Sequence, residues 1–322
     1  MSAAMCEALT PELFERLRDG GLDPGEVTRI AAAALDEDLA GRTDVTTEAT
    51  VPADAVTTAC LVARDDGVAA GLPVAEAVFR VAAARVASVT CTGEDAAQPL
   101  GIVYHKSDGD LVRRGDTLVA ITGGTRALLI AERTALNLAC HLSGIATLTR
   151  RWVDEVAGTG ATVRDTRKTL PGLRALQKYA VRCGGGVNHR MSLSDAVLVK
   201  DNHVAAAGGV TAAFAAVSAA AAGLPIEVEC DTLAQVKEAV AAGATLILLD
   251  NFDLGDTAAA VALVAGHARL EASGGLTLRH AREVAGTGVD YLAVGALTHS
   301  AAALDIALDL GGRQAVGVGG GQ

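Results

Sequence analysis

Residues 164–190 concentrate positive charge in a chain that is acidic as a whole. The segment reads RDTRKTLPGLRALQKYAVRCGGGVNHR, and its seven basic residues accompany one carboxylate, Asp165, in a chain of formal net charge −11. An acidic protein is a poor general binder of nucleic acid, because phosphate backbones attract basic surfaces. A local basic island in such a chain instead predicts a pocket for a small anion.

Five basic side chains in and just after this segment could form that pocket. Arginine makes forked contacts with carboxylates and lysine acts as a point charge, so together they suit a substrate with more than one negative charge. The candidates are Arg167, Lys168, His189, Arg190 and Lys200. The glycines at 184–186 would let the chain approach a ligand or bend to return His189 to the pocket. Three further basic residues lie four apart, as on one helix face, and we expect them to be solvated or paired with another subunit: Arg174, Lys178 and Arg182.

Glu229 and Asp250 each end a short apolar run, and the two runs follow each other along the chain. Mg²⁺ prefers oxygen ligands and commonly takes one or two carboxylates together with substrate phosphates. The pair therefore predicts a Mg²⁺ site, with salt bridges to neighbouring lysines as the alternative.

Small residues follow two later apolar runs, in EASGGL (271–276) and AVGALTHS (293–300). Backbone N–H groups between a strand and a helix are exposed and suit a phosphate, and barrels often hold phosphate in their last two loops. Tight turns alone are the alternative explanation for the glycines. Neither GxxxxGK[ST] nor a strand-linked GxGxxG occurs, so the sequence indicates neither a P-loop nor a dinucleotide fold.

Six short apolar runs separated by helical stretches must position these residues. The runs are TVRDTRK, DAVLVKDN, IEVECD, LILLDN, RLEASGG and DYLAVGA. Alternating strand and helix predicts a parallel sheet, and six units predict an open, incomplete α/β barrel. Since reactive residues of such barrels lie at the carboxyl ends of the strands, one mouth would collect Arg167, Lys168, Lys200, Glu229, Asp250, Ser273 and Gly295.

The first 130 residues predict a different, smaller fold. Residues 9–21 carry helix start and stop signals, a Thr before a Pro and a closing Gly pair. Residues 57–71 and 110–124 alternate or are apolar between Gly and Asp, which favours strands. The turn at Gly115 resembles that of biotinyl and lipoyl carrier domains, but Lys106 lacks the context of an acceptor lysine, so we interpret the likeness as sheet architecture.

The composition also limits which other classes of protein the chain could belong to, such as secreted or membrane proteins. Half of the 322 residues are apolar and only 2% are aromatic, which allows a sizeable core of Ala, Val, Leu and Ile. The six cysteines form no CxxC pair, which predicts reduced thiols in a cytoplasmic protein. Residues 1–20 lack the apolar core of a secretory signal. Residues 204–226 are uncharged but rich in Ala and Gly, so we expect an Ala-rich helix after a loop and no membrane span.

Several blocks together resemble the quinolinate phosphoribosyltransferase family, decarboxylating enzymes of NAD biosynthesis. The blocks are ERTALNLACHLSGIAT, the segment 165–190, LVKDNH, IEVEC, LLDNF, EASGGL and AVGALTHS, and the likeness runs through most of residues 25–305. It implies an N-terminal α/β sandwich domain at 1–131, an α/β barrel phosphoribosyltransferase domain at 132–300, and a segment 301–322 that packs back on the first domain.

The resemblance also implies a reaction and its residues. Quinolinate and phosphoribosyl pyrophosphate would give nicotinate mononucleotide, pyrophosphate and CO₂, with Mg²⁺ as cofactor. Quinolinate would be bound by Arg133, Arg167, His189, Arg190 and Lys200, and phosphoribosyl pyrophosphate by Lys168, Glu229 and Asp250. Thr166 joins the substrate-binding set, and the 5′-phosphate would be held by Ser273, Gly274, Gly275, Val294, Gly295 and Ala296. The catalytic residues would be Lys168, Lys200, Glu229 and Asp250.

The family further implies a homodimer, or a larger assembly of dimers, in which Arg133 enters the neighbouring subunit's pocket. Neither nucleic acid nor a membrane is expected as a partner. Three alternatives stay open at this point: a nicotinate phosphoribosyltransferase, which needs to bind one carboxylate only, a Schiff-base aldolase using Lys200, and a non-catalytic carrier or scaffold built on the first domain.

Overall fold

The computed structural model describes residues 8–90, 100–221 and 223–311. The chain forms two compact units, one of residues 1–147 with 302–322 and one of residues 148–301. Helix α6 (Thr125–Glu155) starts in the first unit and runs into the second. Its first residue lies eight positions before Arg133.

The first unit contains the helices that precede α6. They are α2 (Pro11–Asp19), α3 (Pro24–Leu39), α4 (Val45–Thr50) and α5 (Leu72–Thr90). The side chains of Thr10, Asp23 and Asp44 accept hydrogen bonds from backbone N–H groups in the first turns of α2, α3 and α4. The helix expected at residues 9–21 is thereby confirmed.

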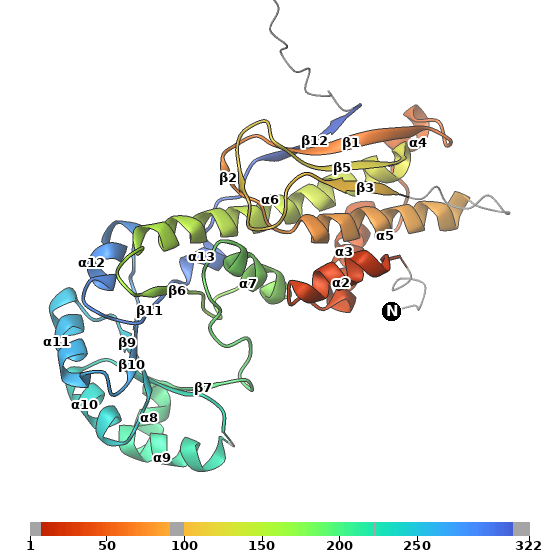
Figure 1. Cartoon of the computed structure of the whole chain (residues 1–322). Coiled ribbons are helices and arrows are strands. Elements are labelled where there is room, and N and C mark those ends of the chain that lie inside the picture. The colour runs from red at the N-terminus through yellow and green to blue at the C-terminus, as the bar shows by residue number, and fades with distance from the viewer. Residues whose placement is uncertain (1–7, 91–99, 222, 312–322) are drawn as a thin grey trace, which may run out of the picture. The chain divides into compact units, whose positions relative to one another are not determined.

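An antiparallel sheet in the order β12-β1-β5-β3 completes this unit. Its strands are β1 (Val56–Ala63), β3 (Gly101–Tyr104), β5 (Thr117–Gly124) and β12 (Ile306–Leu310), and a separate pair joins β2 (Gly67–Val68) to β4 (Leu111–Val112). Strand β12 pairs with β1 in the register Ala59 to Leu310, so the chain after the second unit returns to the first (Figure 1). Lys106 forms an ion pair with Asp116, Nζ to Oδ2, at 2.9 Å.

The second unit holds a six-stranded parallel sheet in the order β6-β11-β10-β9-β8-β7. Its strands are β6 (Thr162–Arg164), β7 (Val197–Val199), β8 (Ile226–Cys230), β9 (Leu246–Asp250), β10 (Arg269–Ser273) and β11 (Tyr291–Ala293). The expected open α/β barrel is confirmed: within the described residues the sheet ends at β6 and β7 without a ladder between them. One detail differs, because β6 ends at Arg164 and leaves Arg167 and Lys168 in the loop that follows.

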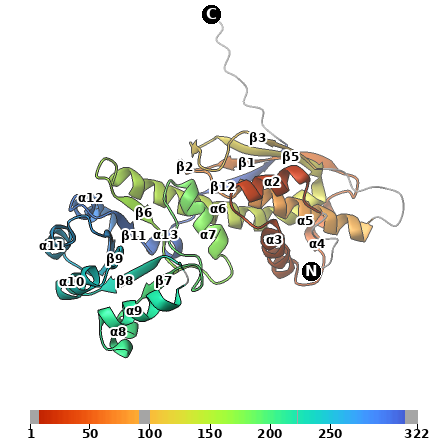
Figure 2. The same cartoon turned by 60° about the horizontal axis from the view of Figure 1, so that its bottom comes forward.

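Helices connect the strands and cover the outside of the curved sheet (Figure 2). They are α7 (Arg174–Cys183), α8 (Asp201–Ala207), α9 (Val210–Ala220), α10 (Leu233–Ala241), α11 (Leu254–Val264), α12 (Ala281–Ala285) and α13 (Ala296–His299), with a 3₁₀ turn at Leu278–His280. Because all six strands are parallel, their carboxyl ends meet at one edge of the sheet.

The Ala-rich tract forms two helices in place of one. Gly208 and Gly209 both adopt positive φ angles, 86° and 141°, and separate α8 from α9. No single helix in the described ranges is long and apolar enough to span a membrane, whereas α8 and α9 meet that measure only as a pair bent by 95°.

Cys60, Cys140 and Cys230 are free thiols, and burial raises the pKa of Cys230 to about 12. Cys6 and Cys91 lie outside the described residues.

Candidate active site

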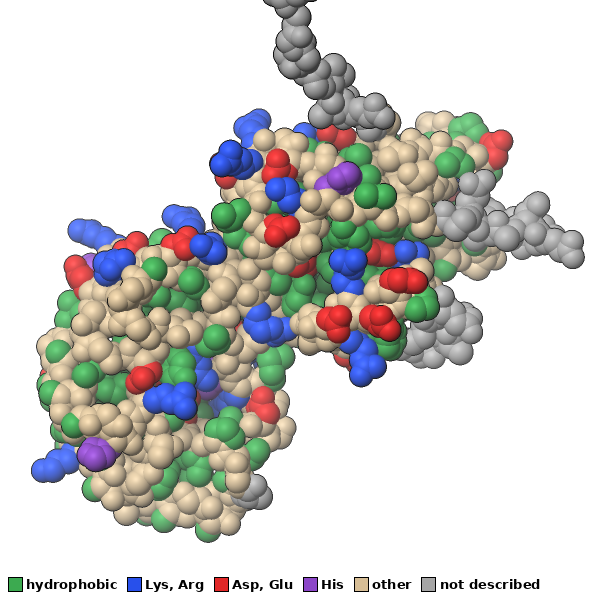
Figure 3. Space-filling view, in the orientation of Figure 1, with side chains coloured by type: hydrophobic (Ala, Val, Ile, Leu, Met, Phe, Trp, Pro, Cys, Tyr) green, Lys and Arg blue, Asp and Glu red, His purple; other side chains and the backbone are tan. Residues whose placement is uncertain are grey.

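A pocket of about 250 Å³ opens at the carboxyl ends of the parallel strands. Nine of the predicted site residues line it: Thr166, Arg167, Lys168, His189, Arg190, Lys200, Glu229, Asp250 and Ser273. The remaining wall is formed by Leu198, Leu248, Glu271 and Ala293. Figure 3 shows basic and acidic side chains gathered within a hollow of this unit. The structure thus brings the predicted cations and carboxylates into one site.

Arg167 and Arg190 bring two guanidinium groups close to each other in the pocket. Arg190 donates from Nη1 to the carbonyl of Ala196 at 3.0 Å, and both burial and the nearby charge of Arg167 lower the pKa of Arg190. In the described part of the chain, the buried Nε of Arg167 has no hydrogen-bond partner. Two guanidinium groups held this way are stabilised by an anion between or beside them.

Glu229 is the penultimate residue of β8 (Ile226–Cys230), and Asp250 is the last residue of the neighbouring strand β9. The side chain of Glu229 is only 13% exposed, and its Oε2 lies 3.6 Å from Lys200 Nζ. Burial raises the pKa of Glu229, Lys200 opposes that rise, and the charge of Asp250 adds to it. A divalent cation bound by both carboxylates would offset the cost of burying the charge of Glu229 and its repulsion by Asp250. The donor set therefore fits Mg²⁺.

Lys178 is fully buried, which corrects the expectation that it is solvated or pairs with another subunit. Its ammonium donates to Asp165 Oδ1 at 2.7 Å, to the His189 carbonyl at 2.7 Å and to the Arg190 carbonyl at 2.9 Å. Asp165 also accepts from the His189 N–H at 2.8 Å. Asp165 is also fully buried, so its carboxylate needs a counter-charge. Lys178, on the face of α7 turned toward β6, supplies that charge.

Arg174 and Arg182 hydrogen-bond to the same loop, and Arg182 is exposed, as expected from the sequence. Arg174 donates to Thr169 Oγ1 and to the Met191 carbonyl, both at 3.0 Å, and Arg182 donates to Asn188 Oδ1 at 2.5 Å. All three cations of α7 therefore shape the segment that carries His189 and Arg190.

The glycine triplet returns the chain to the sheet. Gly185 has a φ of 88°, and a Cβ at Gly186 would come within 2.9 Å of Thr149 and Val181 side-chain atoms. Beyond the triplet, Val187 forms a parallel bridge with Arg164 at the end of β6. Of the two roles expected for these glycines, the structure shows the bend that brings His189 to the pocket.

Six predicted site residues do not line the pocket themselves. Gly274, Gly275, Val294, Gly295 and Ala296 follow the lining residues Ser273 and Ala293 directly. Gly274 has a φ of 85°, and a Cβ there would overlap the Asn251 side chain. A Cβ at Gly295 would come within 3.0 Å of Lys168 Cδ. Arg133 is exposed on α6 and lines a different pocket, in the first unit, with Glu132 and Asp44.

Comparison with known proteins decides the family. Residues 44–143 match the model of the quinolinate phosphoribosyl transferase N-terminal domain, and residues 145–309 match that of the C-terminal domain. The chain belongs to the quinolinate phosphoribosyltransferase family.

Named members of this family match over most of their length. The nicotinate-nucleotide pyrophosphorylase (carboxylating) of Mycobacterium leprae is 54% identical over 86% of this chain and 94% of its own. The crystal structure of NadC from Streptococcus pyogenes superimposes with a TM-score of 0.81 at 39% identity, covering 89% of this chain and 97% of that one. Human nicotinic acid phosphoribosyltransferase, at 16% identity and a TM-score of 0.55, shares the fold alone.

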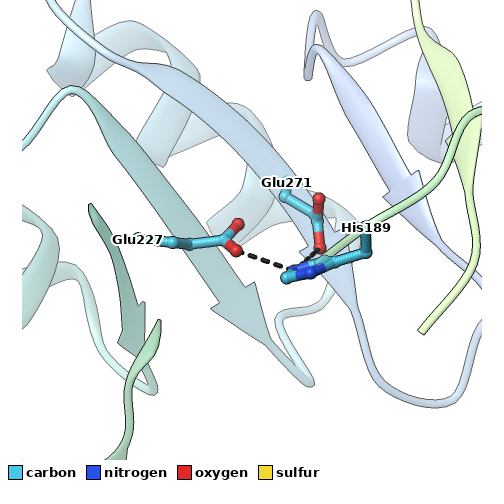
Figure 4. Close-up of side chains that lie close together, drawn as sticks. All are labelled: His189, Glu227 and Glu271. Atoms are coloured by element: carbon cyan, nitrogen blue, oxygen red, sulfur yellow. Dashed lines mark ion pairs between the residues drawn. The ribbon is translucent and has the colours of Figure 1, made fainter. Parts of the chain in front are cut away.

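Three further charged residues form a cluster with His189 that was not predicted from the sequence. Glu227 on β8, Glu271 on β10 and Arg164 on β6 come from three strands, and the side chains of Glu227 and Glu271 point toward His189 (Figure 4). Burial and the charge of Glu227 raise the pKa of Glu271 to about 7. A signal was present: Glu227 and Glu271 each precede a predicted site residue, Glu229 or Ser273, by two positions, which places both on the same strand face.

Proposed function

We propose that this pocket transfers the phosphoribosyl group of phosphoribosyl pyrophosphate to quinolinate, with loss of CO₂, to give nicotinate mononucleotide and pyrophosphate. The observation that carries the proposal is the pairing, in one pocket, of four Arg and Lys side chains with the carboxylates Glu229 and Asp250. The cations suit the dianionic quinolinate and a pyrophosphate group, and membership in the family supports the same reaction.

The chemistry assigns a task to each group. Attack of the pyridine nitrogen on ribose C1 builds positive charge on the ribose while pyrophosphate leaves with growing negative charge. Lys168 neutralises that leaving charge, and Arg167, Arg190 and Lys200 orient the two carboxylates of quinolinate. The new bond leaves the ring nitrogen cationic, so it stabilises the electron pair that stays on the adjacent ring carbon as the carboxylate departs as CO₂, and a proton from solvent then adds to that carbon. Cations that bound the departing carboxylate too tightly would slow this step, because only stabilisation of the transition state accelerates it.

Glu229 and Asp250 would hold Mg²⁺, partly through substrate and water. When bound, the ion supplies electrostatic stabilisation to the pyrophosphate and ribose oxygens. Glu229→Gln and Asp250→Asn are expected to raise the Mg²⁺ concentration for half-maximal turnover by about tenfold or more. Titration of Mg²⁺ at saturating substrates measures this, with Glu283→Gln, an exposed carboxylate on α12, as the matched control. Unchanged titrations in both variants would leave the two residues as salt-bridge partners.

The remaining assignments complete the proposal. Thr166 adjoins the substrate, and its Oγ1 already accepts the Lys168 N–H at 3.0 Å. The loops after β10 and β11, with Ser273, Gly274, Gly275, Val294, Gly295 and Ala296, would hold the 5′-phosphate through backbone N–H groups. Arg133 would complete the pocket of a partner in a homodimer. We also propose domain limits of 1–131 and 132–300. A cytoplasmic location is part of the same proposal, and the thiols of Cys60, Cys140 and Cys230 support it.

Release of CO₂ from carboxyl-labelled quinolinate tests the reaction. We expect release only when phosphoribosyl pyrophosphate and Mg²⁺ are both present, with one pyrophosphate formed per CO₂. Lys168→Ala is expected to abolish nearly all turnover, whereas Lys237→Ala, an exposed lysine on α10, should not change it. Turnover of labelled nicotinate with none of quinolinate would refute the proposal, and borohydride trapping on Lys200 with a carbonyl substrate would favour an aldolase.

A further inference from the structure

The buried cluster around His189 occupies both nitrogens of its ring. The backbone N–H of Arg190 donates to His189 Nδ1 at 2.7 Å. On the opposite side, Nε2 lies 2.8 Å from Glu227 Oε2 and 3.5 Å from Glu271 Oε1 (Figure 4). His189 is 9% exposed, Glu227 3% and Glu271 0%. Water is therefore a minor partner for any of the three.

These contacts decide where the imidazole proton lies. A ring nitrogen that accepts a hydrogen bond does so through its lone pair and carries no proton. Nδ1 of His189 is such an acceptor, so the single proton of the neutral ring is on Nε2. Nε2 lies 2.8 Å from Glu227 Oε2, which makes this carboxylate the nearest charged neighbour of the protonated ring nitrogen.

The three side chains could instead be considered as metal ligands, because their ligand atoms lie within 4.8 Å of one another. A metal would need the lone pair of Nε2, which moves the ring proton to Nδ1. Nδ1 would then present an N–H to the N–H of Arg190. The backbone contact thus favours a proton over a metal at this position.

Glu271 is held in place from the other side of the cluster. Its Oε2 accepts from Arg164 Nη1 at 2.5 Å, and the Arg164 guanidinium lies over the Tyr291 ring at 4.6 Å. In the described part of the chain, the buried Oε1 atoms of Glu227 and Glu271 have no hydrogen-bond partner. Both carboxylates therefore border the imidazole with acceptor capacity to spare.

We propose that Glu227 and Glu271 are positioning residues that hold His189 as the neutral Nε2–H tautomer, so that His189 lines the pocket without a charge or a free N–H donor. Glu227 accepts the ring proton, and Glu271, anchored by Arg164, closes the other side of the ring. If the proposed function holds, the negative charge of quinolinate is recognised by the Arg and Lys side chains, and His189 contributes shape. This departs from the sequence prediction, which counted His189 among the cations.

Nitrogen-15 NMR of the full chain with labelled histidine tests the tautomer without any reference to activity. The chain has seven histidines, and the signals lost in His189→Gln assign this one. We expect a protonated, pyrrole-type Nε2 and an unprotonated, pyridine-type Nδ1. Glu227→Gln, whose amide oxygen still accepts a proton, should keep this pattern, and Glu227→Leu should lose it. Glu283→Leu is the exposed control.

A doubly protonated His189, a pyridine-type Nε2, or an unchanged pattern in Glu227→Leu would overturn the proposal. So would a divalent metal that copurifies in stoichiometric amount and is lost in Glu227→Leu, since that would place an ion where we place a proton.

Kinetics separate this proposal from the proposed function. We expect Glu227→Leu to raise the KM for quinolinate about tenfold, the effect of losing one hydrogen bond to a charged group, with the KM for phosphoribosyl pyrophosphate unchanged. Glu227→Gln should restore a nearly normal value. Equal changes in both KM values would contradict a positioning role. Absence of quinolinate turnover in the unmodified protein would instead refute the proposed function and leave the NMR result standing.

Discussion

Removing the ammonium of Lys178 should destabilise the second unit strongly, because Lys178→Met keeps the apolar stem and deletes three hydrogen bonds at once. Asp165 would lose the cation that is bonded to it, and the carbonyls of His189 and Arg190 would lose a donor. Burial already raises the pKa of Asp165 and lowers that of Lys178, so each charge depends on the other. Breaking a buried pair in this way costs about 3–5 kcal/mol of unfolding free energy.

The single tryptophan, Trp152, provides the assay, since it lies in the same unit and is 3% exposed. Its fluorescence during urea unfolding should show the loss in Lys178→Met. The double variant with Asp165→Asn should be about 2 kcal/mol more stable than the sum of the single changes, because the buried charge is removed together with its partner. Arg150→Met, which breaks an exposed pair with Asp154 at 2.8 Å, should cost less than about 1 kcal/mol. A loss in Lys178→Met as small as in this control, or strict additivity with Asp165→Asn, would refute the reasoning.

Three further predictions concern the pocket. Arg190→Lys should raise the KM for quinolinate much more than that for phosphoribosyl pyrophosphate, because a fork is replaced by a point charge; steady-state kinetics with each substrate varied would show equal effects if the assignment is wrong. Arg133→Ala and Lys168→Ala should each be nearly inactive, yet a reannealed mixture should regain about a quarter of normal activity, since about half the dimers are mixed and each has one intact site; an inactive mixture despite proven subunit exchange would exclude a shared site. The pKa of Glu271 rises from its ordinary 4.5 to about 7 on folding, so the folded state binds this proton more tightly, and the unfolding free energy should fall by roughly 3 kcal/mol between pH 4.5 and pH 8. Urea midpoints across that range should flatten in Glu271→Gln, and an equal slope in both proteins would count against the assignment.

The sequence predicted the strand ends of the second unit well, and the reason is physical. A parallel sheet is buried on both faces, so its strands are short apolar runs, and the polar residue that closes each run marks the edge where the pocket lies. Lys200, Glu229, Asp250 and Ser273 were found in this way.

Residues whose polar groups are satisfied inside the fold were assigned wrongly or missed. Lys178 shares the spacing of a solvated helix face, and only the three-dimensional position of Asp165 shows that this face is buried. Glu227 and Glu271 lie within strands, where a charge reads as an interruption of an apolar run. Their partners, Arg164 and His189, are distant in sequence, so the period of two along each strand was the only local signal.

The open sheet has a mechanical consequence. Between β6 and β7, the described chain offers no ladder of backbone hydrogen bonds, and the segment carrying His189 and Arg190 crosses from one edge to the other. Within this segment, Arg190 donates a hydrogen bond to the Ala196 carbonyl, which contributes about 1 kcal/mol. The sheet is therefore expected to deform most easily at this gap, which lies beside Arg167 and Arg190. An anion bound by both arginines would link them and make this part of the wall more rigid.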